Sequence, residues 1–138
     1  MSVVIDASLT MAWYFEDEST AATNELLDRV SEAGAVVPGL WRLEVANAFQ
    51  TAIRRRRIDA AYRDASLREL AVMPTTIDAD TNSNAWTTTL RLAERFSLSM
   101  YDAAYLELAE RRSLPPATLD AELRGAAPAL GVALLGTP

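Results

Sequence analysis

The sequence predicts an α/β fold in which a short central parallel sheet of about five strands is flanked by helices. Short runs rich in β-branched and small apolar residues alternate with longer segments whose apolar residues recur at helical spacing. The first run, Val3-Val4-Ile5, is apolar on both faces, as interior strands of parallel sheets are. Half of the 138 residues are apolar and 23% are charged, so we expect one hydrophobic core and a single domain over residues 1–138.

The first half of the chain begins with a strand and reaches its second strand after two helices. We expect Ser8 to be the N-cap of the first helix and Gly34 to end the second. Val45, Phe49 and Ala52 give the third helix a core-facing stripe. In chain order, the predicted elements are strand 3–5, helices 9–15 and 19–33, strand 35–37, and helices 40–57 and 58–72.

The second half continues the alternation between strands and helices. Pro74 precedes one strand, and Pro115-Pro116 opens another, because proline is tolerated at the first position of a strand. In chain order, the predicted elements are strand 75–77, helices 78–96 and 100–112, strand 117–119, a short helix ending at 127, and strand 131–134.

Three missing residue types exclude whole classes of chemistry. The chain has no Cys and no His, and all 13 basic residues are Arg. Thiol nucleophiles, Ser–His triads, zinc–thiolate sites, Schiff bases and a P-loop are therefore excluded. Carboxylates become the main reactive groups, and alone they suit hard cations such as Mg²⁺ or Mn²⁺. With no long apolar run and no leader pattern, we expect a cytoplasmic protein and no membrane contact.

Two carboxylates follow predicted strands directly. Asp6 and Asp120 each come after an apolar strand and before a helix, and parallel strands would bring both to one sheet edge, where ligands bind in α/β folds. Asp102 and Glu44 lie in early turns of predicted helices. Two of these four carboxylates also have a purely local interpretation. Asp6 can be a turn residue that helps to cap the following helix, and Asp102 can be part of a Ser99-x-x-Asp102 capping box.

If these four carboxylates converge, a cation is the natural way to offset their repulsion. Two carboxylates about 4 Å apart repel by roughly 4 kcal/mol at an effective dielectric of 20. A divalent cation would reduce that repulsion, and Ser8, Asn47 and Thr118 are candidates to orient carboxylates or bound water around it. Because the chain lacks His, a histidine general base is excluded, and metal-activated water is the nucleophile that this set of residues leaves.

Four motifs, in order and spanning nearly the whole chain, resemble those of one protein family. They are Val4-Ile5-Asp6-Ala7-Ser8 with Trp13 downstream, Leu43-Glu44-Val45-Ala46-Asn47, Tyr101-Asp102-Ala103-Ala104-Tyr105-Leu106, and Thr118-Leu119-Asp120-x-x-Leu123. Each motif alone is weakly specific, but the set resembles PIN-domain proteins. More narrowly, it resembles VapC toxins of type II toxin–antitoxin operons. One departure is Pro115-Pro116, which stiffens the approach to Asp120 and bears on the length of that strand.

The resemblance implies a Rossmann-like PIN fold and an Mg²⁺- or Mn²⁺-dependent endoribonuclease that leaves a 5′-phosphate and a 3′-hydroxyl. It also implies a homodimer that a cognate VapB-type antitoxin neutralises. We expect three of the family's four acidic positions to hold the metal, and the fourth, Glu44, to be an outer ligand or to orient the attacking water. The implied metal and supporting positions are Asp6, Asp102 and Asp120, with Ser8, Asn47 and Thr118.

Two further features have both a functional and a structural interpretation. The run Arg54, Arg55, Arg56 and Arg57 either contacts RNA phosphates or complements a helix C-terminus in an otherwise acidic chain of net charge −6. The side chains of Trp13, Tyr14 and Trp41 either form a dimer or antitoxin surface or pack in the core.

Three rival functions remain open at this point. One is a related PIN or flap-type nuclease that is not a toxin and acts on DNA. Another is a phospho-acceptor receiver domain, which uses a late Lys that this chain lacks. The third is a non-catalytic interaction module with an acidic pocket, against which the four retained carboxylates argue.

Overall fold

A four-stranded parallel sheet lies at the centre of the computed structural model, which describes residues 2–132 and 135. Its strands, β1 (Val3–Ile5), β2 (Ala35–Val37), β3 (Thr75–Ile77) and β4 (Pro116–Ala117), lie in the order β3-β2-β1-β4. Val4 pairs with Val36 on one side and Pro116 on the other, so β1 is an interior strand. The predicted parallel α/β sheet and the interior position of the first strand are confirmed.

The described residues contain four strands, against the five or so predicted. Of the predicted last strand, 131–134, residues 133 and 134 lie outside the described part of the chain. Leu135 makes one isolated parallel bridge to Ala117, and its N–H donates to the Pro116 carbonyl at 3.0 Å. A single bridge is not a ladder, so this segment extends the sheet beyond β4 at one residue.

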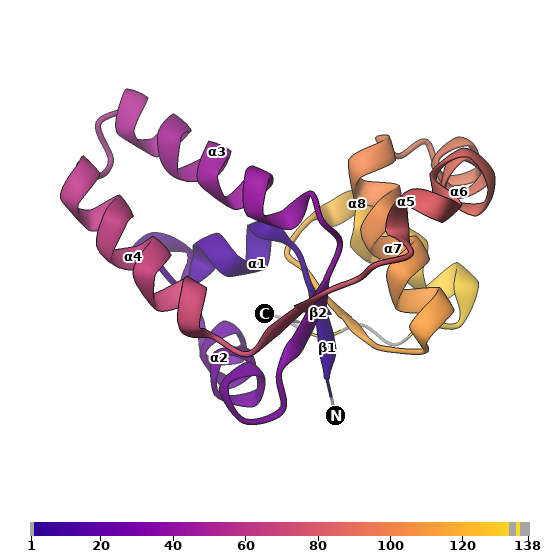
Figure 1. Cartoon of the computed structure of the whole chain (residues 1–138), viewed down its shortest axis with the longest axis horizontal. Helices are drawn as coiled ribbons and strands as arrows, with labels where there is room; N and C mark the ends of the chain where they lie inside the picture. The colour runs from indigo at the N-terminus through magenta and orange to yellow at the C-terminus, as the bar shows by residue number, and fades with distance from the viewer. Residues whose placement is uncertain (1, 133–134, 136–138) are drawn as a thin grey trace.

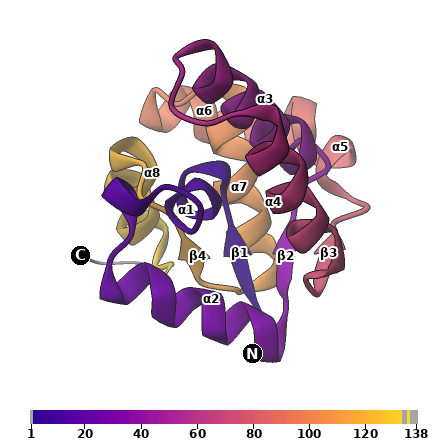
Figure 2. The same cartoon turned by 90° about the vertical axis from the view of Figure 1, so that its left-hand side faces the viewer.

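Helices cover both faces of the sheet, giving three layers (Figures 1 and 2). One group lies on one side, and the other, which includes the central helix α7, lies on the opposite side. The first group is α1 (Ala7–Ala12), α2 (Ala21–Ala33), α3 (Trp41–Arg54) and α4 (Ala60–Val72), and the second is α5 (Thr81–Asn84), α6 (Leu90–Phe96), α7 (Met100–Arg112) and α8 (Ala121–Ala126). Three short turns complete the fold, η1 (Glu16–Glu18), η2 (Ala85–Thr89) and η3 (Ala127–Leu130).

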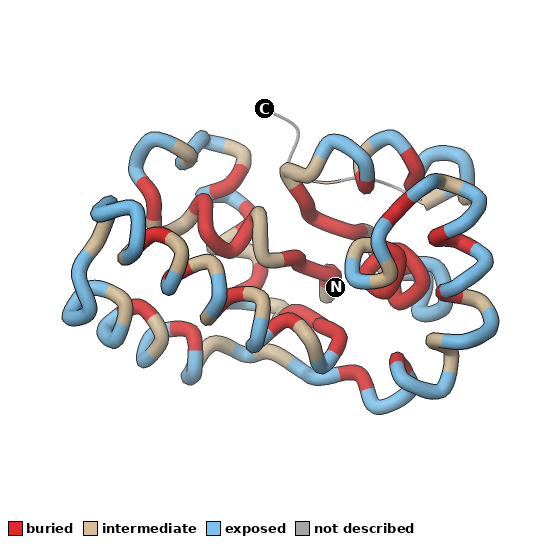
Figure 3. Tube along the Cα trace, turned by 90° about the horizontal axis from the view of Figure 1, so that it is seen from above, coloured by how far each residue is buried: buried red, intermediate tan, exposed pale blue. Residues whose placement is uncertain are grey.

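The core follows the sheet and α7, and the exposed residues form the outer surface (Figure 3). α7 is buried without interruption from Ala103 to Ala109, because it packs on β1 and also contacts α6, η2 and α8. A helix enclosed in this way does not need a one-sided apolar stripe. In the described part of the chain, no helix is both long and apolar enough to cross a membrane.

Helix α1 begins earlier than predicted, and the prediction that Ser8 caps it is wrong. The N-cap is Asp6, whose carboxylate accepts the Leu9 N–H at 2.9 Å. Asp is as good an N-cap as Ser, and β1 ends at Ile5, so the helix starts directly after the strand. Asp6 therefore both caps α1 and lies at the carboxyl end of β1.

The predicted helix 78–96 is also divided. It begins at Thr81, and a π-helical turn, η2, separates α5 from α6. Three consecutive threonines, Thr87, Thr88 and Thr89, have low helix propensity and coincide with this turn. The shift at the start leaves Asp78 free for a different role, described below.

Candidate metal centre

Asp6 is the most constrained carboxylate at the carboxyl edge of the sheet. Its residue is 5% exposed. Oδ1 accepts from the Leu9 N–H at 2.9 Å and from the Ser8 hydroxyl at 2.8 Å, and Oδ2 accepts from the Thr118 hydroxyl. A carboxylate offers about four acceptor positions, so three are used and one on Oδ2 remains for a cation or a bound water.

Ser8 and Thr118 tie the ends of β1 and β4 together. The Ser8 hydroxyl accepts the Leu119 N–H at 3.1 Å, and the Thr118 hydroxyl accepts the Asp120 N–H at 3.0 Å. Both hydroxyls also donate to Asp6. The two predicted supporting residues thus fix the backbone before Asp120 relative to the Asp6 carboxylate.

Asp102 and Asp120 enter the same site from the first turns of two helices. Asp120 is the N-cap of α8 and accepts the Leu123 N–H at 3.0 Å, while the Asp102 N–H donates to the Ser99 hydroxyl at 3.1 Å. One carboxylate oxygen of each lies within 4.8 Å of the other and of a Glu122 oxygen. Glu122 was not predicted. Its position two residues after Asp120, in the first turn of α8, was the available signal.

Glu44 completes the group from the opposite side of the sheet. It lies in the first turn of α3, is half-buried, and accepts a 2.6 Å hydrogen bond from the Tyr105 hydroxyl on α7. Sequence reasoning assigned Tyr105 no role. It lies three residues after Asp102 and therefore on the same face of α7, which was the missed signal.

The charges of these carboxylates act on one another's pKa values. Burial raises the pKa of Asp6, and the charge of Asp120 adds to the effect, although hydrogen bonds from Thr118, Leu9 and Ser8 oppose it. Burial also raises the pKa of Glu44, with further increases from the charges of Asp102 and Asp6. The pKa of Asp102 is raised by burial and then by the charges of Asp120 and Glu122.

The donor set fits a divalent cation. Every predicted ligand is a carboxylate, and one oxygen each from Asp102, Asp120 and the unpredicted Glu122 are close enough to share one ion. Asp6 is not in that group of three but keeps a free acceptor position. Carboxylate oxygens are the ligands that Mg²⁺ and Mn²⁺ prefer. A bound cation would also relieve the mutual repulsion that raises these pKa values.

The remaining predicted site residues, Asn47 and the arginine run, lie on α3 or directly after its end at Arg54. Asn47 is exposed, and no hydrogen bond between described residues joins it to the carboxylates. The arginine run lies at the far end of α3, and Arg54 is about 15 Å along the helix from Glu44. Arg57 pairs with Asp17 at 2.9 Å and Glu18 at 3.3 Å, so its charge is partly used within the fold.

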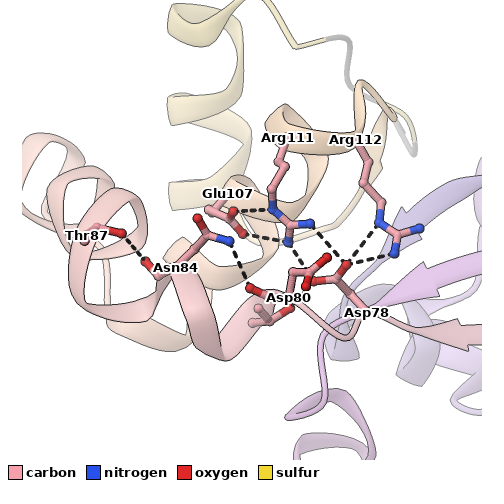
Figure 4. Close-up of polar contacts among 8 residues, drawn as sticks. Asp78, Asp80, Asn84, Thr87, Glu107, Arg111 and Arg112 are labelled. Atoms are coloured by element: carbon pink, nitrogen blue, oxygen red, sulfur yellow. Dashed lines mark hydrogen bonds and ion pairs between the residues drawn. The ribbon is translucent and has the colours of Figure 1, made fainter.

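Two other neighbouring arginines, Arg111 and Arg112, form ion pairs within the fold (Figure 4). Arg111 and Arg112, in the last turn of α7, contact Asp78 at 2.6 and 2.9 Å, and Arg111 also pairs with Glu107 at 2.6 Å. The Asp78 side chain is fully covered. Burial alone would raise the pKa of Asp78, but hydrogen bonds from Arg111, Thr81 and Arg112 outweigh it and hold that pKa below its usual range.

The aromatic residues singled out for a partner surface pack within the domain. Trp41 is 3% exposed and its indole N–H donates to the Thr10 hydroxyl at 3.1 Å. The Trp13 indole N–H donates to the Thr23 carbonyl at 2.8 Å, and the Tyr14 ring meets Phe49 edge-on at 5.8 Å. The large apolar residues that are exposed are different ones, and they include Leu43, Trp86 and Tyr101.

The fold and the acidic site agree with the comparisons. A sequence profile of the PIN domain matches residues 3–127, and the chain belongs to the PIN-domain family. PIN domains are generally metal-dependent nucleases, which accords with the acidic cluster.

A solved structure with the same fold is the crystal structure of PAE2754 from Pyrobaculum aerophilum. It has a TM-score of 0.67 and 22% sequence identity, and the match covers 91% of this chain and 84% of that one. Among curated proteins, none matches this sequence.

Proposed function

We propose that this PIN domain is a Mg²⁺- or Mn²⁺-dependent endoribonuclease, the toxin component of a VapBC-type toxin–antitoxin system. The observation that supports the nuclease proposal is the group of carboxylate oxygens from Asp102, Asp120 and Glu122, together with the effect of these and neighbouring carboxylates on the pKa values of Asp6 and Glu44. The chain offers no Cys, His or Lys that would serve a rival hydrolytic mechanism.

Asp6, Asp102 and Asp120 would hold the cation, and Glu122 extends the same donor set. A cation held there would supply activated water and neutralise charge on the phosphate. Three hydrogen bonds hold the Asp6 carboxylate in place without an ion. Glu44 is an outer ligand of the cation or orients the attacking water, and the products carry a 5′-phosphate and a 3′-hydroxyl.

The enzymatic part is tested by cleavage of single-stranded RNA and of DNA of the same sequence. We expect EDTA to abolish RNA cleavage, Mg²⁺ or Mn²⁺ to restore it, and Asp6→Asn to remove most of it. Asp28→Asn, the same chemical change at an exposed position on α2, is the matched control and should leave cleavage intact. Full activity in excess chelator would contradict the proposal. Cleavage of DNA but not of RNA would support the rival function, a PIN-type nuclease that acts on DNA.

The toxin part is tested in cells. Expression of the wild type should arrest growth, whereas Asp6→Asn should not. Co-expression of a small antitoxin-like reading frame from directly upstream should restore growth. If the wild-type protein cleaves RNA in vitro but does not slow growth, the nuclease proposal stands and the toxin proposal is contradicted. The same proposal includes a homodimer and action on RNA in the cytoplasm.

A further inference from the structure

One hydrogen bond joins the two helical layers at the carboxyl edge of the sheet. α3 and α7 belong to opposite layers (Figure 1), and the Tyr105 hydroxyl on α7 donates to Oε1 of Glu44 on α3 at 2.6 Å. The two residues are 61 positions apart in the chain. This bond therefore fixes the place of Glu44 relative to the helix that carries Asp102.

Tyr105 is built to hold that position rigidly. The residue is 2% exposed and lies within the buried stretch of α7. Its ring has only two side-chain torsions, and close packing in the core fixes both. The hydroxyl is therefore held at a defined point one turn below Asp102.

Glu44 needs such support because its own helix provides little. The Glu44 N–H donates to the Leu40 carbonyl at 3.0 Å, which holds the backbone, but the side chain has three flexible torsions and its one hydrogen bond among the described residues is to Tyr105 on α7. Repulsion from Asp102 and Asp6 would otherwise favour a rotamer directed away from the site. Among the described groups, Tyr105 is the hydrogen-bond partner of Oε1, and Oε2 has none, which leaves Oε2 available to a water.

We propose that Tyr105 is a positioning residue that acts through Glu44, holding Oε1 so that Oε2 is presented to the water attacking the RNA phosphodiester. This inference rests on the proposed nuclease function and deepens it. Tyr105 itself contacts neither RNA nor cation. Its removal should therefore change turnover and leave the binding of both nearly unchanged.

The primary test is Tyr105→Phe, which removes the hydroxyl and keeps the ring. We expect kcat on single-stranded RNA to fall about 10- to 100-fold, as for loss of a hydrogen bond to a charged group. KM should stay within about twofold of the wild-type value. The rise in melting temperature caused by Mn²⁺ should stay within about one degree of that of the wild type, on the order of assay error. An unchanged kcat, or a rise in KM that accounts for the whole loss, would overturn the proposal.

The matched control is Tyr62→Phe. The Tyr62 hydroxyl also makes a 2.6 Å hydrogen bond, to the Tyr14 carbonyl, and neither residue is among the acidic cluster. Its loss should leave kcat unchanged. An equal fall in both variants would show a general effect of lost hydrogen bonds and overturn the specific role of Tyr105.

A double-mutant cycle with Glu44→Gln shows whether Tyr105 acts through Glu44. If it does, Tyr105→Phe should have little further effect on kcat in the Glu44→Gln background. If the two substitutions instead reduce kcat by independent factors that multiply in the double mutant, Tyr105 does not act through Glu44.

Crystal structures of the wild type and of Tyr105→Phe provide a readout that does not depend on activity. We expect the Glu44 carboxylate to move or to become disordered in the variant while Asp6 stays in place. If the wild type cleaves no nucleic acid, the proposed function fails, yet this comparison still decides whether Tyr105 positions Glu44. An unmoved Glu44 would overturn the inference.

Discussion

The buried ion-pair cluster around Asp78 gives a prediction whose size follows from the structure. Asp78→Asn keeps the shape of the side chain but removes its negative charge. That charge forms ion pairs with Arg111 and Arg112 and accepts a hydrogen bond from the Thr81 hydroxyl. The Asp78 side chain is 0% exposed, whereas the two arginines are 27% and 36% exposed. Breaking a buried pair costs about 3–5 kcal/mol, and partial exposure of the arginines lowers the expected cost to about 3 kcal/mol. For a chain of this size that corresponds to a fall in melting temperature of roughly 10 °C.

The control is Asp64→Asn. Asp64 pairs with Arg63 at 2.9 Å, but its side chain is 53% exposed, so its loss should cost less than about 1 kcal/mol. Differential scanning calorimetry of wild type and both variants at neutral pH measures the difference. Equal melting temperatures for the two variants would refute the reasoning, because burial would then not determine the strength of the pair.

The pH dependence of the same cluster has a defined sign. The pKa of Asp78 is held below its usual range, so the folded state releases this proton more readily than the unfolded state. Its stabilisation is therefore present above the unfolded pKa of about 3.9 and is lost as pH falls through the lower folded value. In Asp78→Asn, stability should fall less steeply below about pH 4 than in the wild type.

Three further predictions concern the metal-free site, the arginines and the oligomeric state. The pKa values of Asp6, Glu44 and Asp102 are raised in the folded protein, so the metal-free protein should lose stability as pH rises from about 4 through these raised pKa values. Mn²⁺ should reverse that loss at neutral pH. A melting temperature in EDTA that does not change with pH would contradict this. If the exposed Arg55 and Arg56 contact RNA phosphates, replacing both by Gln should weaken RNA binding and flatten its log–log salt slope by about 1.4, whereas an unchanged slope would leave them a structural role at the end of α3. Light scattering at tens of micromolar should give a dimer, and a monomer would count against that part of the proposal.

Asp6, Asp102 and Asp120 each have a local sequence pattern around them, whereas the role of Glu44 came from the family resemblance. A buried apolar strand followed by Asp and a helix start placed Asp6 and Asp120 at the same edge, since parallel strands share their carboxyl ends. The capping pattern around Ser99 also described real local geometry, because the Ser99 hydroxyl does accept the Asp102 N–H. Local and functional interpretations were not exclusive, since Asp6 caps α1 and belongs to the acidic site.

What sequence reasoning missed depends on contacts between distant segments. The partner of Glu44 is 61 residues away, and the arginine partners of Asp78 are 33 and 34 residues away. No periodicity carries such pairings, because they follow from how α7 crosses the sheet. For Trp41 the sequence left two alternatives, a partner surface or the core, and only the fold shows that Thr10 lies beside its indole N–H.

The most direct test of the central claim is to locate the cation itself. Crystals grown with Mn²⁺ should show an anomalous scattering peak at the carboxyl edge of the sheet, with oxygens of Asp102 and Asp120 about 2.1 Å away, as hard cations bind carboxylates. The peak should disappear in Asp120→Asn crystals grown in the same way. Absence of a peak at saturating Mn²⁺, or a peak only at carboxylates outside this group, would contradict the assignment of Asp6, Glu44, Asp102 and Asp120 to one metal-dependent active site.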